Sequence, residues 1–405
     1  MHALLLGQHY APEVTAGRFR MEAFARELVA RGHSVEVICP VPNHPAGVVR
    51  EGFRGKLTRT LDLDGARVRY VWVRASPKKT TMARLAYYAS YAAMASITGV
   101  LRRRPDVVFA TSPPLSVGAA GALLAKRHRV PWVLDVRDVW PEVAVTLGEL
   151  SDERIIRAVE RLERALYRDA ARVVTVTEAF CSDIRARSDE PAKVALIRNG
   201  TTREWLAAAR GEGERAALGL PEDRFVWTYA GNLGLSHNLG DAIEAAGLLG
   251  DGFELQVIGE GPARAELEDR ARSLARGSVV FRDLMPPDAV RVHLRSADAL
   301  LVIQRGDLRK VVSSKFFDCC AIARPVIVVA EGEMIEMVRD AEAGIPVPAG
   351  SPKAIAAAVR CLRDDPGGAG RLAERGREYA ARHLREDQAA ELADMLEALA
   401  SPHSA

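Results

Sequence analysis

Short apolar segments alternate with segments of helical periodicity along most of the chain, and this alternation limits the fold more than any other feature. Residues 3–6, 299–303 and 326–329 are uninterrupted apolar runs. Such runs are typical of parallel strands that are covered on both faces. The segments between them have the length and spacing of crossover helices, so the sequence predicts βαβ units and an α/β fold.

The alternation occurs twice, in two halves of similar size. Strands are predicted at 3–6, 34–39, 67–73, 106–111, 132–136, 172–177 and 194–197, and again at 225–230, 253–258, 279–281, 299–303 and 326–329. The charged, glycine-rich segment 203–224 separates the halves, and a chain of 405 residues suits two domains. We therefore expect two doubly wound, Rossmann-like domains facing across a cleft, at 1–204 and 205–375. Helices at 376–405 should follow and pack back toward the first domain.

The composition excludes several classes of protein. Lysine and arginine number 56 against 53 acidic residues, and a net charge of +3 gives no reason to expect a nucleic-acid partner. The five cysteines include no C-x-x-C pair, which argues against a disulfide framework or a zinc site. The first ten residues resemble a strand and its loop more than a signal peptide. We expect a cytoplasmic protein with no metal and no cofactor.

The stretch 304–329 has the features of a diphosphate site. Ser313 and Ser314 stand where N-cap residues belong, which predicts a helix from about Lys315. Its first turn would offer free N–H groups and a positive dipole end to an anion. Asp318, three residues later, can face the same ligand and suits a ribose diol. Further cations lie close by: Arg305, Arg309 and Lys310. The plainer alternative is a basic surface loop before an ordinary amphipathic helix.

Polar residues also follow the predicted strands of the first half. The opening βαβ unit lacks G-x-G-x-x-G, although Gly17 allows a close approach to a phosphate or sugar. The long loop 40–56 carries Asn43, His44 and Pro45, and long loops in compact domains are often functional.

The most crowded of these segments, 135–142, contains Asp135, Arg137, Asp138, Trp140 and Glu142 at the carboxyl end of a predicted strand. Ligands of open α/β sheets bind at such ends. A loop of mutually satisfied ion pairs is the alternative interpretation.

Segment 82–101 is rich in alanine, tyrosine, methionine and leucine. Arg84 interrupts it, which argues against a membrane-spanning helix. A helix packed on the sheet is the simpler prediction. The flanking cations of 78–104 and the tyrosines also allow peripheral contact with a membrane surface, at the inner face of the plasma membrane.

Several motifs together resemble a known family. They are His9-Tyr-Ala-Pro-Glu13, Arg31-Gly-His-Ser-Val35, Pro42-Asn-His-Pro45, Ala110-Thr-Ser-Pro-Pro114, the segment 135–142, Tyr229-Ala-Gly-Asn232, Gly259-Glu-Gly-Pro262, Ser313-Ser-Lys315 and Pro325-Val326. In this order and spacing the chain resembles the family 4 glycosyltransferases of the GT-B fold. The resemblance is to the subgroup that builds bacterial surface polysaccharides, such as N-acetylfucosamine and colanic-acid transferases.

The resemblance implies metal-independent, retaining transfer of a sugar, of an N-acetylated hexosamine type, from a UDP-sugar. The acceptor would be a glycan, a lipid-linked glycan or a natural product. The implied catalytic residues are Lys315, Asp138 and His44. The implied donor-binding residues are Gly17, Gly231, Asn232, Glu260, Gly261, Arg282, Arg309, Lys310 and Asp318. The implied acceptor-side residues are Asn43, Arg137 and Glu142.

The chain departs from the family pattern near the expected donor site. Asp318 replaces the common glutamate, Lys310 stands where many members carry another glutamate, Ala323 replaces glycine and Ser313 replaces proline. These changes leave the donor open and admit a specialised pathway such as natural-product glycosylation. Two other functions suit a two-domain α/β chain: a UDP-sugar 2-epimerase, and a non-catalytic two-lobed sugar-binding protein.

Overall fold

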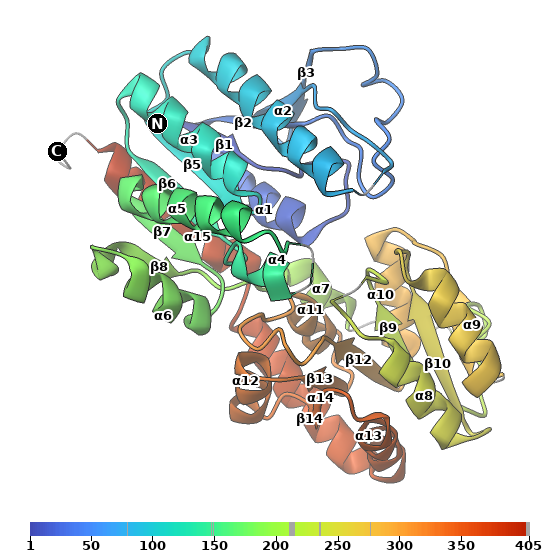
Figure 1. Ribbon diagram of the computed structural model, residues 1–405. Coiled ribbons are helices and arrows are strands. Elements are labelled where there is room, and N and C mark those ends of the chain that lie inside the picture. The colour runs from blue at the N-terminus through green and yellow to red at the C-terminus, as the bar shows by residue number, and fades with distance from the viewer. Residues whose placement is uncertain are drawn as a thin grey trace. The chain divides into compact units, whose positions relative to one another are not determined.

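The computed structural model describes residues 1–78, 80–146, 148, 150–209, 215–234, 236–275 and 277–401. The chain divides into two compact units (Figure 1). Unit 1 contains Met1–Arg198 and Arg385–Ala405, and unit 2 contains Asn199–Leu384. Each unit is a layered α/β structure around one sheet, with helices on both faces.

The sheet of unit 1 has eight strands in the order β3-β4-β2-β1-β5-β6-β7-β8. The strands are β1 (His2–Leu6), β2 (Ser34–Pro40), β3 (Thr58–Leu63), β4 (Ala66–Val71), β5 (Val107–Ser112), β6 (Trp132–Val136), β7 (Arg172–Thr175) and β8 (Val194–Leu196). All neighbours pair in parallel except β3, which runs antiparallel to β4. β3 was not predicted, because as a half-exposed edge strand it carries no apolar run.

The helices of unit 1 cover both faces of this sheet. They are α1 (Ala16–Ala30), α2 (Thr81–Val100), α3 (Leu115–His128), α4 (Glu142–Thr146), α5 (Glu153–Asp169), α6 (Glu178–Arg187), the short 3₁₀ helix η1 (Pro191–Lys193) and α15 (Arg385–Ala400). Neighbouring residues of β5 show the two faces: Thr111 lies next to Gly7 on the side of α1, and Ala110 lies against Gly121 of α3. The order reverses at β1 and β5, so loops after these strands border the usual ligand crevice.

The C-terminal segment forms two helices that belong to different units. α14 (Pro366–Ala381) packs on α11 (Lys315–Ala321) in unit 2, whereas α15 packs on α1 in unit 1 (Figure 1). Arg31 Nη1 lies 2.5 Å from a carboxylate oxygen of Asp394, and His33 Nε2 lies 2.7 Å from one of Glu397. These contacts tie the end of the chain to unit 1.

The sheet of unit 2 has six parallel strands in the order β11-β10-β9-β12-β13-β14. They are β9 (Phe225–Ala230), β10 (Phe253–Ile258), β11 (Val279–Arg282), β12 (Ala299–Ile303), β13 (Val326–Ala330) and β14 (Ile345–Pro348). The helices are α7 (Arg203–Ala208), α8 (Gly240–Leu249), α9 (Arg264–Leu274), α10 (Pro287–Ser296), α11 (Lys315–Ala321), α12 (Glu333–Ala341), α13 (Pro352–Asp364) and α14.

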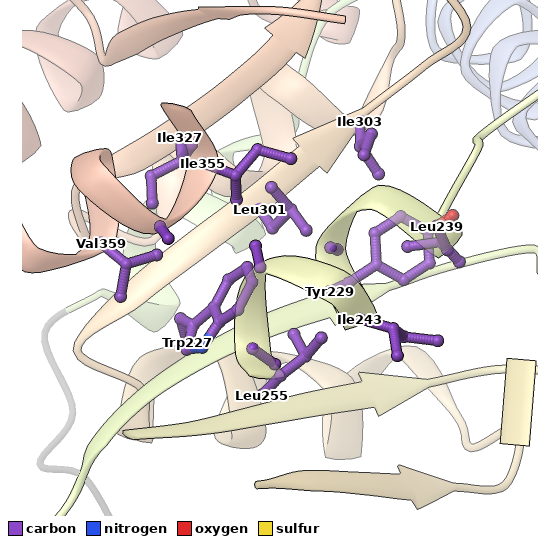
Figure 2. Close-up of a cluster of buried hydrophobic side chains, with 14 of the residues drawn as sticks. Trp227, Tyr229, Leu239, Ile243, Leu255, Leu301, Ile303, Ile327, Ile355 and Val359 are labelled. Carbon is purple, nitrogen blue, oxygen red and sulfur yellow. The ribbon is translucent and has the colours of Figure 1, made fainter. Parts of the chain in front are cut away.

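Two apolar layers enclose the sheet of unit 2. One contains side chains of α8, α9 and α13, and the other contains side chains of α10, α11, α12 and α14. Figure 2 shows the first layer, in which Trp227 and Tyr229 of β9 lie among aliphatic side chains of the neighbouring strands and helices. Tyr229 is fully buried and stands near the carboxyl end of β9, so its hydroxyl marks the inner edge of the loop that follows.

The helix predicted to begin near Lys315 does begin there, as α11. Its N-cap differs from the prediction. Ser314 has helical backbone angles and its side chain makes no capping hydrogen bond. The serine hydroxyl therefore does not occupy the first-turn N–H groups of α11, as an N-cap side chain normally would.

Segment 82–101 lies almost wholly in α2, whose Tyr91 is buried against the sheet and donates its hydroxyl to Ile38 O at 2.9 Å. Among the residues that the structure describes, no helix is both long enough and apolar enough to span a bilayer.

Candidate active site

Glycines bring two loops of unit 2 into direct backbone contact at the carboxyl ends of β9 and β10. Gly231 N donates to Ile258 O at 2.9 Å, and Leu233 N donates to Glu260 O at 2.9 Å. A Cβ added at Gly259 would lie 2.0 Å from Gly231 O, and one at Gly261 would lie 2.4 Å from Leu233 O. Larger residues would force the loops apart, so both glycines are required for this junction.

Lys315 of α11 lies on the first of these loops. A Cβ added at Gly231, where φ is +153°, would lie 2.1 Å from Lys315 Cε. The Lys315 ammonium lies 3.2 Å from the Tyr229 hydroxyl and 5.1 Å from the centre of its ring, a cation–π distance. Gly231 therefore makes room for the lysine, and Tyr229 supports its charge.

His237 completes this group and is not among the residues predicted from the sequence. Lys315 Nζ and His237 Nε2 form a short hydrogen bond, and His237 Nδ1 lies 2.6 Å from Ser236 Oγ. Because the ammonium can only donate, His237 accepts through Nε2 and carries its proton on Nδ1, toward Ser236. The available signal was a histidine in the glycine-rich loop that follows a parallel strand.

Burial sets the charges of this pair. Burial lowers the pKa of Lys315 to about 8, and burial together with the Lys315 charge lowers the pKa of His237 to about 2. At neutral pH the lysine is therefore a cation and the histidine is neutral. Within the described parts of the chain no carboxylate forms an ion pair with Lys315, so this is a cation held by neutral groups.

Other predicted donor-site residues surround the same loops. The main-chain oxygen of Asn232 accepts the Tyr229 hydroxyl at 2.8 Å. Glu260 is half exposed and pairs with Arg264, whose other nitrogen contacts Asp283. Arg282 turns its side chain to Leu218 O at 2.8 Å, while its own carbonyl accepts Gly259 N at 3.1 Å.

The remaining cations of the 304–329 stretch are less enclosed. The Arg309 side chain is 65% exposed, and its guanidinium lies 3.7 Å from Glu331. Arg305 pairs with Asp307 in the same stretch. Lys310 precedes α11 and Asp318 lies in its first turn, and both are partly exposed. The structure thus groups Gly231, Asn232 and Lys315 closely, with Arg309 nearer the surface.

In unit 1 a buried network connects β5, β6 and α1. Arg20 and Asp135 form a buried ion pair at 2.9 Å, with side chains 5% and 0% exposed. Thr111 Oγ1 donates to Asp135 at 2.8 Å and accepts from Arg137 Nε at 3.0 Å. Asp135 is therefore a structural anchor for the segment that carries Arg137 and Asp138.

Gly17 and Arg137 are brought together, although they lie 120 residues apart in sequence. A Cβ added at Gly17 would lie 2.6 Å from Arg137 Nη1, so glycine lets the guanidinium rest on the first turn of α1. Burial lowers the pKa of Arg137. Burial raises the pKa of Asp138 to about 6, against the opposing effect of Arg137. Asp138 can therefore change its protonation state close to neutral pH.

A second group in unit 1 is organised by Glu13, which the sequence analysis quoted in a motif without a role. Its carboxylate accepts the main-chain N–H groups of Asn43 and His44 at 2.7 and 2.8 Å, and lies 2.5 Å from His9 Nδ1. The His9 and His44 rings meet edge to face, with centroids 5.2 Å apart. Hence the loop after β1 holds the loop that carries the predicted catalytic His44.

Aromatic contacts extend from this group toward the segment after β6. Asn43 Nδ2 donates to the Tyr87 hydroxyl at 3.3 Å. The Tyr87 and Tyr88 rings are 5.9 Å apart, and Tyr88 and Trp140 are 6.5 Å apart. Glu142 pairs at 3.0 Å with Arg187. In the described chain no group of three or more His, Cys, Asp or Glu side chains is arranged to hold a metal.

Comparison with known proteins agrees with this architecture. Two family models match: residues 16–200 match a "Glycosyl transferase 4-like domain", and residues 224–365 match "Glycosyl transferases group 1". The structure also superposes on the Anabaena protein HepE, which was solved with UDP and glucose. That match has a TM-score of 0.74 and 15% identity, and covers 98% of this chain and 100% of HepE.

The fold and both matched segments define a two-domain glycosyltransferase with the GT-B fold, as predicted. The chain belongs to family 4 of these enzymes and transfers a sugar from a nucleotide sugar.

Two curated relatives show how far the sequence similarity extends. The Escherichia coli K12 protein described as "Putative colanic acid biosynthesis glycosyl transferase WcaI" is 26% identical over 343 residues, which are 82% of this chain and 84% of the relative. Alpha-D-kanosaminyltransferase of Streptomyces kanamyceticus is 27% identical over 221 residues, 52% and 56% of the two chains. These similarities support transfer chemistry over the epimerase and the non-catalytic binding protein.

Proposed function

We propose that this enzyme is a metal-independent, retaining transferase that takes a sugar of an N-acetylated hexosamine type from a UDP-sugar. The observation that carries the proposal is Lys315, a partly buried cation at the carboxyl ends of two parallel strands, whose hydrogen-bond partners among the described residues are the neutral groups of Tyr229 and His237. A buried charge without a counterion costs folding free energy, so its presence calls for an anionic ligand. The diphosphate of a nucleotide sugar is such a ligand.

The reaction needs a cation at this place. When the bond between the sugar and the diphosphate breaks, negative charge grows on the leaving phosphate. The Lys315 ammonium stabilises that charge without a metal, and Arg309 adds a second, more exposed cation. The departing phosphate can take the proton of the acceptor hydroxyl as the new glycosidic bond forms on the same face of the sugar, which retains its configuration.

The two units divide the task in this proposal. Unit 2 binds the donor, with Gly231 and Asn232 beside the diphosphate, Asp318 toward the ribose, and the chain near Glu260, Gly261 and Arg282 toward the base. Unit 1 binds the acceptor, with Asp138 and His44 as catalytic candidates, and Gly17 is a candidate for contact with a phosphate or sugar. Asn43, Arg137 and Glu142 lie on the acceptor side.

The relatives indicate only the chemical class of the acceptor. A relative described as a colanic acid enzyme suggests a polysaccharide precursor, and a kanosaminyltransferase suggests a small natural product. A lipid-linked glycan would bring the enzyme to a membrane surface. Exposed apolar side chains at both ends of α2, at Met82, Leu85, Ile97 and Leu101, lie beside the basic residues of segment 78–104 and support peripheral contact there. Lys79, part of that segment, lies outside the described residues.

The test is calorimetric binding of UDP, GDP, ADP and their sugar derivatives to the purified enzyme with EDTA present throughout. We expect uridine-selective binding that weakens by about tenfold to a hundredfold in Lys315→Ala, because a charge-assisted contact is lost. Turnover should fall by at least as much. Binding without uridine preference, binding that requires a divalent metal, or normal turnover in Lys315→Ala would contradict the proposal.

Lys315→Arg provides the matched control. It keeps the positive charge but replaces a compact ammonium by a planar guanidinium. The Lys315 side chain lies directly against Gly231, so there is little room for a larger group. We therefore expect Lys315→Arg to keep part of the affinity for UDP and little of the turnover.

A further inference from the structure

The loop after β1 holds an imidazole that has no role in the proposed function so far. His9 Nδ1 lies 2.5 Å from Glu13 Oε2, and the side chains are 17% and 6% exposed. The other carboxylate oxygen of Glu13 accepts two main-chain N–H groups, from Asn43 and His44. Glu13 is thus fixed at both oxygens and holds His9 in one orientation.

The charge of Glu13 determines which His9 nitrogen carries a proton. Burial opposes ionisation of Glu13, but the hydrogen bonds from His9 and from the two main-chain N–H groups outweigh it, and the pKa of Glu13 is lowered. A carboxylate can only accept, so His9 donates through Nδ1. In the neutral ring, Nε2 then presents a lone pair on the opposite side.

This lone pair has no partner in the part of the chain that the structure describes. Among the described residues His9 makes one hydrogen bond, through Nδ1, and its ring also packs edge to face against the ring of His44. Because His9 is partly exposed, Nε2 is accessible and open to a hydrogen-bond donor from a ligand.

The position of His9 indicates that Nε2 binds a ligand and not water alone. β1 stands at the point where the strand order of unit 1 reverses, and the loop after it borders the crevice where ligands of such sheets bind. The groups around Glu13 are a cation, an amide and aromatic rings: Arg18 Nη1 donates to Glu13 O at 2.8 Å, Asn43 bonds to Tyr87, and Tyr88 packs against Trp140. Hydrogen-bonding groups beside aromatic rings suit a polyol such as a sugar.

We infer that His9 Nε2 accepts a hydrogen bond from a hydroxyl group of the acceptor sugar, and that Glu13 is the residue that positions His9 for this contact. The inference rests on the proposed function and extends it by adding a site on unit 1. It differs from the prediction for His44, whose main chain, rather than its ring, is held by Glu13.

Two variants separate binding from structure at this position. His9→Asn places an amide N–H near the former Nδ1, so it keeps the contact with Glu13 and removes Nε2. His9→Gln places its amide near the former Nε2 and can still accept from a hydroxyl. His33→Asn serves as the control, because His33 is another partly buried histidine of unit 1 that pairs with a carboxylate, Glu397.

The experiment uses the full chain with saturating UDP and a panel of methyl α- and β-glycosides of glucose, galactose, mannose and N-acetylglucosamine. Binding is followed by saturation-transfer NMR, and UDP affinity is measured separately by calorimetry. We expect a glycoside that binds the unsubstituted enzyme to bind His9→Asn at least about fivefold more weakly, since a hydrogen bond is lost. His9→Gln should recover part of the affinity, and UDP should bind equally to all variants.

The result distinguishes this inference from the proposed function. If UDP does not bind the unsubstituted enzyme, the proposed donor is wrong. If UDP binds but no glycoside does, or if His9→Asn binds the glycoside as tightly as the unsubstituted enzyme, the inference is overturned while the donor site stands. Equal weakening in His33→Asn and His9→Asn would also overturn it, because it would show a general effect on unit 1.

Discussion

The two units differ in whether a charged side chain removed from solvent has a counterion. In unit 1, Arg20 and Asp135 neutralise each other in the interior, and Thr111 and main-chain oxygens satisfy their remaining hydrogen bonds. In unit 2, the partly buried Lys315 is held, among the described residues, by the neutral groups of Tyr229 and His237. A buried charge that has a counterion contributes to holding the fold together. A charge without a counterion costs folding free energy and is available to bind a ligand.

The largest effect should come from breaking the compensated pair. Asp135→Ala leaves Arg20 buried without its counterion, and we expect the free energy of unfolding of unit 1 to fall by about 3–5 kcal/mol. Lys315→Met removes a charge that has no counterion, so the stability of unit 2 should stay the same or rise. Scanning calorimetry of the full chain measures both, and a large loss of stability in Lys315→Met would contradict the comparison.

The second effect concerns space around the uncompensated cation. Gly231→Ala would place a methyl group 2.1 Å from Lys315 Cε and displace the lysine. We expect UDP binding to weaken by about tenfold to a hundredfold, as for loss of a charge-assisted hydrogen bond.

Gly250→Ala is the control for backbone strain. Gly250 also has a positive φ, +86°, but nothing lies within 4 Å of an added Cβ. This variant should lose some stability and keep its affinity for UDP. If both variants lose UDP equally, strain in the backbone, and not the position of Lys315, explains the result.

These contrasts show where sequence reasoning succeeds. The order of strands and helices follows from apolar runs and their spacing, because each run must be buried on both faces of a sheet. The place of Lys315 follows from a local helix start. Gly17 permits a close approach, but the group that approaches it is the Arg137 guanidinium, and its predicted contact with a phosphate or sugar stays a prediction.

What the sequence did not reveal depends on contacts between distant segments. His237 is significant only because α11 brings Lys315 against it, 78 residues later in the chain. Glu13 becomes important because a loop 30 residues away turns its N–H groups toward it. The exposed strand β3 and the division of the last helices between the units likewise depend on tertiary packing, which local periodicity does not record.

A third prediction uses pH to separate stability from binding in unit 2. The pKa of Lys315 is lowered to about 8 in the folded enzyme, from an ordinary value near 10.5. Between these values the unfolded chain holds more protons than the folded one, so this group makes stability rise with pH. UDP needs the charged lysine, so its affinity should fall up to tenfold per pH unit above about pH 8. Calorimetric titrations of UDP from pH 6.5 to 9.5 would show this.

Lys315→Arg tests the assignment of that pH dependence. A guanidinium stays charged over this range, so the decline in UDP affinity above pH 8 should disappear. His237, with a pKa lowered to about 2, stays neutral throughout and does not contribute. A decline that persists in Lys315→Arg would assign the dependence to another group, such as the ligand itself.

The smallest effect concerns the outer surface of unit 1, where charges are hydrated and each contributes little. Arg103 and Arg104 are exposed at the end of α2, beside the exposed side chains of Ile97 and Leu101. If this surface meets a bilayer, changing either arginine to serine should weaken binding to anionic vesicles by about fivefold, near 1 kcal/mol per charge. Sedimentation with phosphatidylserine vesicles measures this, with Arg161→Ser on α5 as the charge-matched control.

Because surface attraction is screened by salt whereas the Lys315 site is partly buried, raising the salt concentration should abolish vesicle binding and leave most of the UDP affinity intact. Vesicle binding that is equal in the variant and the control would remove α2 from any role at a membrane.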